Sequence, residues 1–553
     1  MTAITTSELI YLLPILILGL AIIVLLFLLL LLRINTKFAA LFTVVSLAIA
    51  LSTSTFVGYQ IIVNTDKQHD TIIAPLSVQT QSADVLSTEL ELYPPDPTPV
   101  APSLAIKQAN LVQAEEHLAV YWQASYVTAL FTSDGYGALY TSLVLILSII
   151  VSTLALNWFK NDEETHHGLF YLMILFSALG ATILIYASHL MSLFIGIELL
   201  SIPIVGLIGY QYQRKYALEA AIKYMVLSVI STTFLLLGIA FYYAATGELT
   251  FIGLSFQLST LSAPSTLLLL GVCLMLVGIG FKLALFPFQL WLPDVYQGAP
   301  TCIALWLTTV SKVAVFCAVA RLFLLAPIVN NETIRMIMVI MAFCSIIWGS
   351  VFALKQQNIK RLLAYSSITH FGYLLIALIS VQYQVLALET IGVYLIGYVL
   401  ANICVLSVIS LESRSTEKEE QALDLSGLFW RKPIIALAMG TGLLSLAGVP
   451  LTVGFIGQFS LILLGVTAEL WWLIGAIIIG SALGLYFYLR LVISLYMKPT
   501  HIKVKPSITL FTPKRIDINE FFIVVSALLI LLCGIYPKWL FNLVSVAQYL
   551  SPN

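Results

Sequence analysis

Residues Leu9 to Leu32 form a continuous run of apolar side chains that ends at Arg33. A helix needs about 20 such residues to cross the hydrocarbon core of a bilayer, so this run is long enough to span a membrane. It is too long for the apolar region of a secretory signal peptide, and Glu8 rather than a basic residue precedes it. Backbone in lipid must satisfy its own hydrogen bonds, which a helix does within one segment. The run therefore predicts a membrane-spanning helix.

The composition extends this prediction to the whole chain. Of its 553 residues, 60% are hydrophobic and only 10% are charged, whereas a soluble domain has about 25% charged residues. An integral membrane protein is therefore expected, and a large soluble core is excluded. The net charge of -1 gives no sign of nucleic-acid binding. The six cysteines lie in apolar segments and form no CxxC pair, so iron–sulfur or zinc ligation is not expected.

Fourteen apolar runs divide the chain, which predicts an all-α polytopic membrane protein. The predicted spans are 9–32, 38–62, 136–158, 168–187, 189–210, 217–245, 266–290, 299–326, 334–354, 361–381, 385–411, 433–464, 470–497 and 518–547. Cytoplasmic loops carry an excess of Lys and Arg. Basic residues gather in every second loop, whereas the opposite loops hold little beyond Lys67, Lys107, Arg335 and Lys538. An even number of spans then places both termini outside.

The longest loop, 63–135, is predicted to be external. It contains PPDPTPVAPS and many acidic residues, a composition typical of a disordered or loosely packed insertion, and no chemistry is assigned to it. The expected division of the chain is 1–62 for the first two helices, 63–135 for this loop, 136–167 for the third helix and its loop, 168–330 and 331–497 for two five-helix units, and 498–553 for a cytoplasmic loop and the last helix.

Two predicted helices are interrupted at equivalent places. The seventh breaks at Pro287, and the twelfth breaks at LAGVP, which ends at Pro450. Each is the fourth helix of its five-helix unit, and because five is odd, the two units must be inverted relative to each other. Paired discontinuous helices are typical of a transport site near the midplane of the membrane. Pro and Gly are common in membrane helices for other reasons, so this repeat is a hypothesis from position alone.

Lys282 and Glu198 lie near the middle of the seventh and fifth spans. Burying a charge at the bilayer centre costs about 2.5–3.5 kcal/mol, which a chain tolerates where the charge is paired, hydrated or functional. A Glu198–Lys282 pair would satisfy both charges, and its strength would change whenever another charge approached. A static buried ion pair is the alternative. Backbone carbonyls freed by the break at Pro287 would make a polar pocket beside the amine.

Three further ionisable residues lie inside the spans. Lys312 is too deep in the eighth span for its ammonium to reach an interface, so a proton-relay role is predicted. Lys223 lies near the start of the sixth span with Glu219 four residues before it, and an ordinary ion pair at the helix end explains it equally well. His370 is in the middle of the tenth span. Its unperturbed pKa near 6.5 suits a relay, and a hydrogen-bonded packing histidine is the alternative.

Other polar residues in the spans have simpler explanations. Tyr394, Tyr398 and Asn402 recur at every fourth position of the eleventh span. They could line a hydrated path, but hydrogen bonding between helices is the interpretation that we prefer for the tyrosines. Arg321 and Glu389 lie near span ends, where a long side chain can reach the interface. The central Glu and Lys residues of spans five, seven and eight therefore form a row that suits the passage of protons or cations.

Four stretches resemble a known family. They are GFKLALFPFQLWLPDVYQGAP, NIKRLLAYSSITHFGYLLIAL, LLSLAGVPLTVGFIGQF and LWWLIGAIIIGSALGLYFYLRLVISLY. Together they closely resemble subunit N of bacterial respiratory complex I, the NADH–quinone oxidoreductase, which is one of its three antiporter-like membrane subunits. The LWLPDVYQGAP block is specific to this superfamily. The resemblance covers nearly the whole chain except the Pro-rich external insertion.

The resemblance implies fourteen helices with two inverted five-helix repeats and discontinuous helices seven and twelve. It implies Glu198 and Lys282 as a charged pair, Lys312 as the relay lysine, Lys223 as an additional lysine, and His370 as the histidine of the SSIxH motif. It implies no redox centre in this chain, so that NADH, FMN, iron–sulfur clusters and quinone bind other subunits. The implied partners are neighbouring antiporter-like and small membrane-arm subunits, in the inner membrane of a bacterium.

Two positions depart from the family pattern. Gln458 stands in the broken twelfth helix where the family usually has Lys, and Gln does not titrate. A water chain held by Gln458 could substitute, or the subunit could transmit charge without releasing a proton here. Gln289 replaces a His that is common after the PF pair. Two alternatives to a proton-translocating subunit stay open, namely a cation/proton antiporter subunit of a multisubunit exchanger and a scaffold in the membrane arm that translocates nothing.

Overall fold

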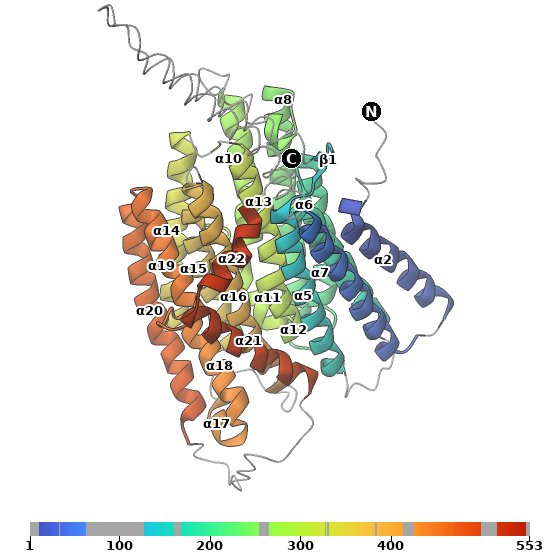
Figure 1. The fold of residues 1–553 in the computed structure, drawn as a ribbon, viewed down its shortest axis with the longest axis vertical. Helices are drawn as coiled ribbons and strands as arrows, with labels where there is room; N and C mark the ends of the chain where they lie inside the picture. Colours follow the sequence, from blue (N-terminus) through green and yellow to red (C-terminus); the bar gives the residue numbers. More distant parts are fainter. Residues whose placement is uncertain are drawn as a thin grey trace, which may run out of the picture.

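The computed structural model of this chain describes residues 10–32, 34–61, 126–159, 167–253, 265–326, 328, 331–381, 384–412, 425–498 and 517–548. Most of these residues lie in helices, and Figure 1 shows the helices packed side by side in one bundle. The predicted all-α membrane fold is confirmed. Residues 63–125 of the long predicted loop lie outside the described residues.

Among the described residues, 13 helical spans are long and apolar enough to cross a membrane. They are α2 (Leu13–Leu31), the helix Thr36–Ile61, α5 (Gly135–Trp158), α6 (Gly168–Tyr186), α7 (Leu190–Ile208), α8 (Ala217–Thr246), α10 (Thr266–Leu283), the span Thr301–Leu325, α14 (Glu332–Leu354), α15 (Ile359–Ile379), α16 (Gln384–Glu412), α20 (Trp471–Tyr496) and α21 (Ile518–Ile535). The remaining predicted span consists of two shorter apolar helices, α18 (Pro433–Leu446) and α19 (Val453–Thr467).

Both predicted interruptions are present. Helix α10 ends at Leu283, where Ala284 takes the left-handed conformation, and the chain resumes as α11 (Trp291–Gly298). The second break separates α18 from α19, with Gly448 and Leu451 at positive φ between them. Broken backbone at membrane depth is tolerated only where protein or water surrounds it. Each break therefore marks a place where polar groups gather inside the bundle.

The span Thr301–Leu325 contains a third irregularity. It consists of α12 (Thr301–Trp306), a π-helical turn at Leu307–Ser311 labelled η3, and α13 (Lys312–Leu325). The hydroxyls of Thr308 and Thr309 donate to the carbonyls four residues before them. Turns of this kind are rare and occur frequently at functional sites. Here the turn immediately precedes Lys312.

The bundle has a buried centre and an apolar periphery. The most apolar stretches of the span Thr301–Leu325 and of α15 are completely buried, and that of α16 is 94% buried. The outermost helices bury much less, for example 28% of the corresponding stretch in α2 and in α21. An exposed apolar helix face is what lipid or a partner subunit covers. The central helices are the ones that carry Lys312, His370 and the tyrosine stripe.

Short elements complete the described residues. A two-stranded antiparallel hairpin, β1 (Tyr126–Thr128) and β2 (Phe131–Thr132), precedes α5. A four-residue helix, α17 (Leu428–Arg431), precedes α18. The helix α22 (Lys538–Ser545) and the turn η6 (Val546–Gln548) follow α21 and contact α16.

The start of α5 corrects one of our predictions. Asp134, at the end of the range predicted as a loop, is buried and accepts a hydrogen bond from the Gly137 amide as the N-cap of α5. Arg321 was predicted to reach toward an interface, but its side chain is buried and forms an ion pair with Asp134. The periodicity of α13 cannot reveal this partner, because the two residues are 187 positions apart.

The second break requires glycine at Gly454. A Cβ atom there would meet the Ser445 carbonyl oxygen well inside van der Waals contact, so α18 and α19 approach closely only because this side chain is missing. We expect Gly454→Ala to destabilise the protein by about 1–3 kcal/mol. The matched control is Gly475→Ala, where no atom lies within 4 Å of the added carbon. Thermal unfolding of the purified protein should give a lower Tm for the first variant only, and equal Tm values would contradict the packing argument.

Candidate functional site

Lys282 lies in the last turn of α10, directly before the first break, and its side chain is 6% exposed. Its Nζ donates to the hydroxyls of Ser201 and Ser228, each at 2.7 Å. The Tyr224 ring centroid is 5.9 Å from Nζ. The predicted polar pocket beside the amine is present, but hydroxyls from α7 and α8 supply it rather than the carbonyls freed by the break.

Glu198 is half-buried on α7, three residues before Ser201. Glu198 and Lys282 do not form an ion pair in the described structure, because no carboxylate oxygen of Glu198 lies within 4.0 Å of the Lys282 nitrogen. The carboxylate is nevertheless near enough to act on the ammonium electrostatically. Glu198 therefore acts on Lys282 through space, whereas Ser201, three residues further along α7, contacts the amine directly.

Lys223 forms ion pairs with Glu219 at 2.6 Å and with Asp294 at 2.9 Å. The first is the pair expected from spacing on α8. The second joins α8 to α11, and the Arg361 guanidinium at the start of α15 binds the other oxygen of Asp294 at 2.6 Å. The side chain of Lys223 is 42% exposed, so this group lies at the surface end of the bundle rather than at its centre.

The charge of Asp294 is fixed at neutral pH. Burial alone would raise the pKa of its carboxyl, but hydrogen bonds from Lys223 and Arg361 outweigh this effect and leave the pKa below its usual value. With a lowered pKa, the ion pairs contribute stability above the unfolded pKa of about 3.9 and lose it as the pH falls through the lower folded value. Asp294 therefore ties α8, α11 and α15 together throughout the physiological range.

Lys312 is 1% exposed at the first position of α13. Its Nζ donates to the Ser367 hydroxyl at 2.7 Å and lies 4.7 Å from the centroid of the Phe371 ring. The Tyr398 hydroxyl donates to the same Ser367 oxygen at 2.8 Å. The structure thus places Lys312 of α13 on a short hydrogen-bonded chain that continues through α15 to α16.

Both ring nitrogens of His370 contact tyrosine hydroxyls. Nδ1 lies 2.6 Å from the Tyr394 oxygen on α16, and Nε2 lies 3.1 Å from the Tyr488 oxygen on α20. The Tyr488 hydroxyl also hydrogen-bonds the Ser366 hydroxyl. The preferred interpretation, hydrogen bonding between helices, describes this geometry. Because imidazole and phenol groups both accept and donate protons, the same contacts form a second chain, which begins one residue from Ser367.

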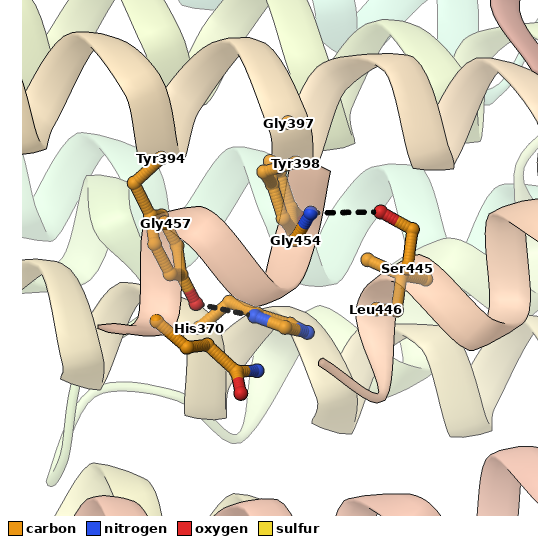
Figure 2. Close-up of a pocket in the computed structure, with 9 residues that line it drawn as sticks. His370, Tyr394, Gly397, Tyr398, Ser445, Leu446, Gly454 and Gly457 are labelled. Atoms are coloured by element: carbon orange, nitrogen blue, oxygen red, sulfur yellow. Dashed lines mark hydrogen bonds between the residues drawn. The ribbon is translucent and has the colours of Figure 1, made fainter. Parts of the chain in front are cut away.

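A small cavity, roomy enough for about one water molecule, lies between His370 and the second break. It is lined by His370, Tyr394, Gly397, Tyr398, Ser445, Leu446, Gly454, Gly457 and Gln458. Figure 2 shows the His370 and Tyr394 side chains joined on one side of it, and the Gly454 amide on the Ser445 hydroxyl on the other. Gln458, which occupies the position of the expected lysine, thus lines the same cavity as His370.

The structure brings the sequence-predicted residues into two groups. Lys282 and Glu198 share one polar region, and Lys312, His370 and Gln458 share the other, whereas Lys223 lies apart from both with Glu219 and Asp294. Sequence reasoning missed the hydroxyl partners, which are Ser201, Ser228, Ser366, Ser367 and Tyr488. A serine in an apolar run is too common to single out. Asp294 was also missed, although it lies inside the LWLPDVYQGAP block.

The described residues contain no group of three or more His, Cys, Asp or Glu side chains that could hold a metal ion. Gln289 is buried at the first break, and its Oε1 has no hydrogen-bond partner among the described residues. The arrangement consists of two buried amines and an imidazole that hydrogen-bond to hydroxyl groups of neighbouring helices. Such a set can hold and pass protons without binding a cofactor.

The family described as NADH:quinone oxidoreductase/Mrp antiporter, TM matches residues 187–484, more than half of the 553 residues. The chain belongs to this family. The matched range includes Glu198, Lys223, Lys282, Lys312 and His370. The resemblance to an antiporter-like membrane subunit is confirmed.

Solved structures of relatives agree over almost the whole length. The chain is similar to one from respiratory complex I of Thermus thermophilus, with a TM-score of 0.70, 26% identity and coverage of 96% of this chain and 98% of that one. Two more distant structures share the fold. One is from an archaeal membrane-bound sulfane sulfur reductase (TM-score 0.74, 20% identity, 98% and 99% covered), and one is from the Mrp complex of Dietzia sp. DQ12-45-1b (0.67, 17%, 81% and 92%). All three belong to multisubunit membrane complexes.

Removing the hydroxyl of Tyr488 tests the hydrogen bonds around His370. Tyr488→Phe leaves His370 Nε2 and Ser366 without their shared partner, which we expect to destabilise the protein by about 1–3 kcal/mol. Tyr486 lies two residues away on the same helix and is 64% exposed, so Tyr486→Phe should change stability by less than about 0.5 kcal/mol. Thermal unfolding of the purified complex measures both. An equal effect of the two changes would show that the Tyr488 hydroxyl contributes nothing there.

Proposed function

We propose that this chain is subunit N of NADH–quinone oxidoreductase and translocates protons in its membrane arm. The observation that carries the proposal is the state of the two buried lysines. No carboxylate of the described residues lies within 4.0 Å of Lys282 or Lys312, and the hydrogen bonds of both ammonium groups in this part of the chain go to serine hydroxyls. Burial disfavours the charged form of an amine, and a serine does not restore it as a carboxylate would. Such an amine can release and rebind a proton.

The hydroxyl chains supply a route for that proton. The Ser367 oxygen accepts from both the Lys312 ammonium and the Tyr398 hydroxyl, so a proton can pass from Lys312 to Tyr398 once the two hydroxyls turn and Ser367 donates to Tyr398. Ser366, Tyr488, His370 and Tyr394 form the parallel chain. The neighbouring residues Ser366 and Ser367 bring the two chains together on α15. The proton then reaches the cavity beside Gln458, where a water held by the amide replaces the usual lysine.

Coupling follows from the same electrostatics. A change of charge near Glu198 alters its attraction for Lys282, and therefore the readiness of Lys282 to release its proton. Redox chemistry would occur in other subunits, which would bind NADH, FMN, iron–sulfur clusters and quinone. This chain would act as part of a translocase in a bacterial inner membrane, beside other antiporter-like and small membrane-arm subunits and with both termini outside.

A cation/proton antiporter subunit is the second candidate. The likeness to the Dietzia Mrp complex and the family description, which includes Mrp antiporters, both support it. Deleting the gene distinguishes the two in the native host. Loss of NADH-driven quinone reduction or acidification supports the first candidate, whereas lower sodium tolerance with intact respiration supports the second.

Lys282→Ala in the native host tests translocation. We expect NADH-driven acidification of membrane vesicles to fall by about 100-fold, the low end of what a positioned proton-transfer group contributes, together with slower NADH-to-quinone electron transfer. The amount of assembled complex is measured in the same membranes. Normal electron transfer and a normal proton yield in an assembled complex would remove Lys282 from the pathway and favour the scaffold interpretation.

Gln458→Leu tests the role assigned to the amide. The leucine side chain is one bond shorter and has no hydrogen-bonding group, so it cannot hold a water beside His370. We expect lower acidification at an unchanged amount of assembled complex. The control is Gln458→Lys, which restores the usual family residue and should retain acidification. If Gln458→Leu pumps as well as the unmodified complex, the second break is not part of the route.

A further inference from the structure

A buried ion pair that the proposed function does not use lies between Lys312 and the predicted external surface. Arg321 is on α13, nine residues beyond Lys312, which corresponds to about 13 Å along the helix. Its Nη1 and Nη2 donate to the two carboxylate oxygens of Asp134 at 2.7 and 2.8 Å. Both side chains are at least 97% buried. Asp134 lies outside the residues that match the family, whereas Arg321 lies within them.

Stability alone does not account for this pair. Taking two charges out of water costs several kcal/mol per ion, and well-packed apolar residues often stabilise a protein as well or better. The pair is also incompletely satisfied, since the Arg321 Nε atom has no hydrogen-bond partner among the described residues. A buried unpartnered group of this kind is expected where a protein stores strain, binds water or carries out chemistry.

Further unpartnered hydroxyls surround the pair. The Tyr136 ring centroid lies 5.0 Å from the guanidinium carbon of Arg321 and 4.7 Å from the Tyr140 ring, to which it is tilted by 59°. The Tyr140 hydroxyl is buried and has no partner in the described part of the chain. The Tyr186 ring lies directly against Gly137, next to Asp134, and its hydroxyl is also buried and unpartnered. Tyr136 and Tyr186 therefore adjoin the ion pair, and the hydroxyls of Tyr140 and Tyr186 have no hydrogen-bond partner among the described residues.

Tyr136 extends the polar region from the pair toward the level of Lys312. The Tyr136 hydroxyl donates to the Cys317 carbonyl at 2.9 Å. Cys317 is five residues beyond Lys312 on α13, about 7.5 Å along the helix, and thus roughly halfway to Arg321. On the predicted external side, strand β2 lies between Asp134 and Leu130, whose side chain is exposed. Asp134 is thus four residues along the chain from an exposed position.

We propose that Asp134 and Arg321 form a proton outlet for this subunit, in which Asp134 takes up the proton released on the Lys312 side and gives it up to the external side. The inference rests on the proposed function. A proton that reaches the Asp134 carboxylate makes it neutral and weakens its attraction for Arg321. Release of the proton toward the hairpin restores the carboxylate and the ion pair. Burial raises the pKa of the Asp134 carboxyl against the opposing effect of Arg321, as a proton-accepting group requires.

Variants of the complete complex in the native host test the outlet. Asp134→Asn keeps an oxygen for the Gly137 amide but cannot titrate, and it leaves Arg321 buried without a counter-charge. The double variant Asp134→Asn/Arg321→Gln removes both charges and avoids that cost. We expect each to lower NADH-driven acidification of vesicles about tenfold or more at a normal amount of assembled complex. The matched control is Glu332→Gln, an exposed carboxylate in the first turn of α14 on the same predicted side, which should pump normally.

A chemical probe of the unmodified complex keeps the test decisive if the variants do not assemble. A membrane-soluble carbodiimide modifies buried carboxyl groups in their protonated form. Mass spectrometry of the peptide containing Asp134 should show modification that increases while NADH is oxidised. Asp134 that stays unmodified during turnover, or a double variant that assembles and pumps normally, overturns the outlet. If Lys282→Ala also pumps normally, the proposed function itself fails. If only Lys282→Ala loses acidification, the outlet alone is wrong.

Discussion

The structure depends first on the rule that backbone in lipid satisfies its own hydrogen bonds. This rule makes every long apolar run a helix and confines irregular backbone to the inside of the bundle. The two breaks, after Leu283 and after Leu446, and the π-helical turn before Lys312 obey it. Each irregularity is adjacent to a buried polar side chain that the candidate site uses. The departures from regular helix are therefore also the places where chemistry becomes possible.

The second constraint is the cost of a buried charge. Four arrangements meet it in different ways. Asp294 is paired twice at the surface end, and Asp134 with Arg321 forms a bidentate pair deep in the protein. Lys282 and Lys312 are instead held by hydroxyls. The two ion pairs of Asp294 keep its charge fixed, whereas the hydroxyl partners of Lys282 and Lys312 leave these amines able to change their protonation state. This contrast, rather than the number of charges, separates anchoring groups from candidate relay groups.

Sequence reasoning predicted where the spans lie, both breaks and the central lysines, because hydrophobicity, proline and isolated charges are local signals. It missed that the last predicted span, 518–547, divides into α21 and α22. It did not find the partners. The Glu198–Lys282 contact expected from the family is replaced here by serine hydroxyls, and Arg321 is paired rather than interfacial. A hydroxyl in an apolar helix carries no sequence signal of its own, and an ion pair across 187 residues of chain leaves none.

The sequence by itself determined that this protein lies in a membrane, where its helices begin and break, and which few ionisable side chains are buried. These properties follow from free energies of transfer into lipid, which act residue by residue. Only the tertiary structure decided which groups those side chains contact, that Gln458 shares a cavity with His370, and that Asp134 reaches Arg321. Contacts of this kind depend on how helices distant in the sequence pack, and packing is a property of the whole bundle.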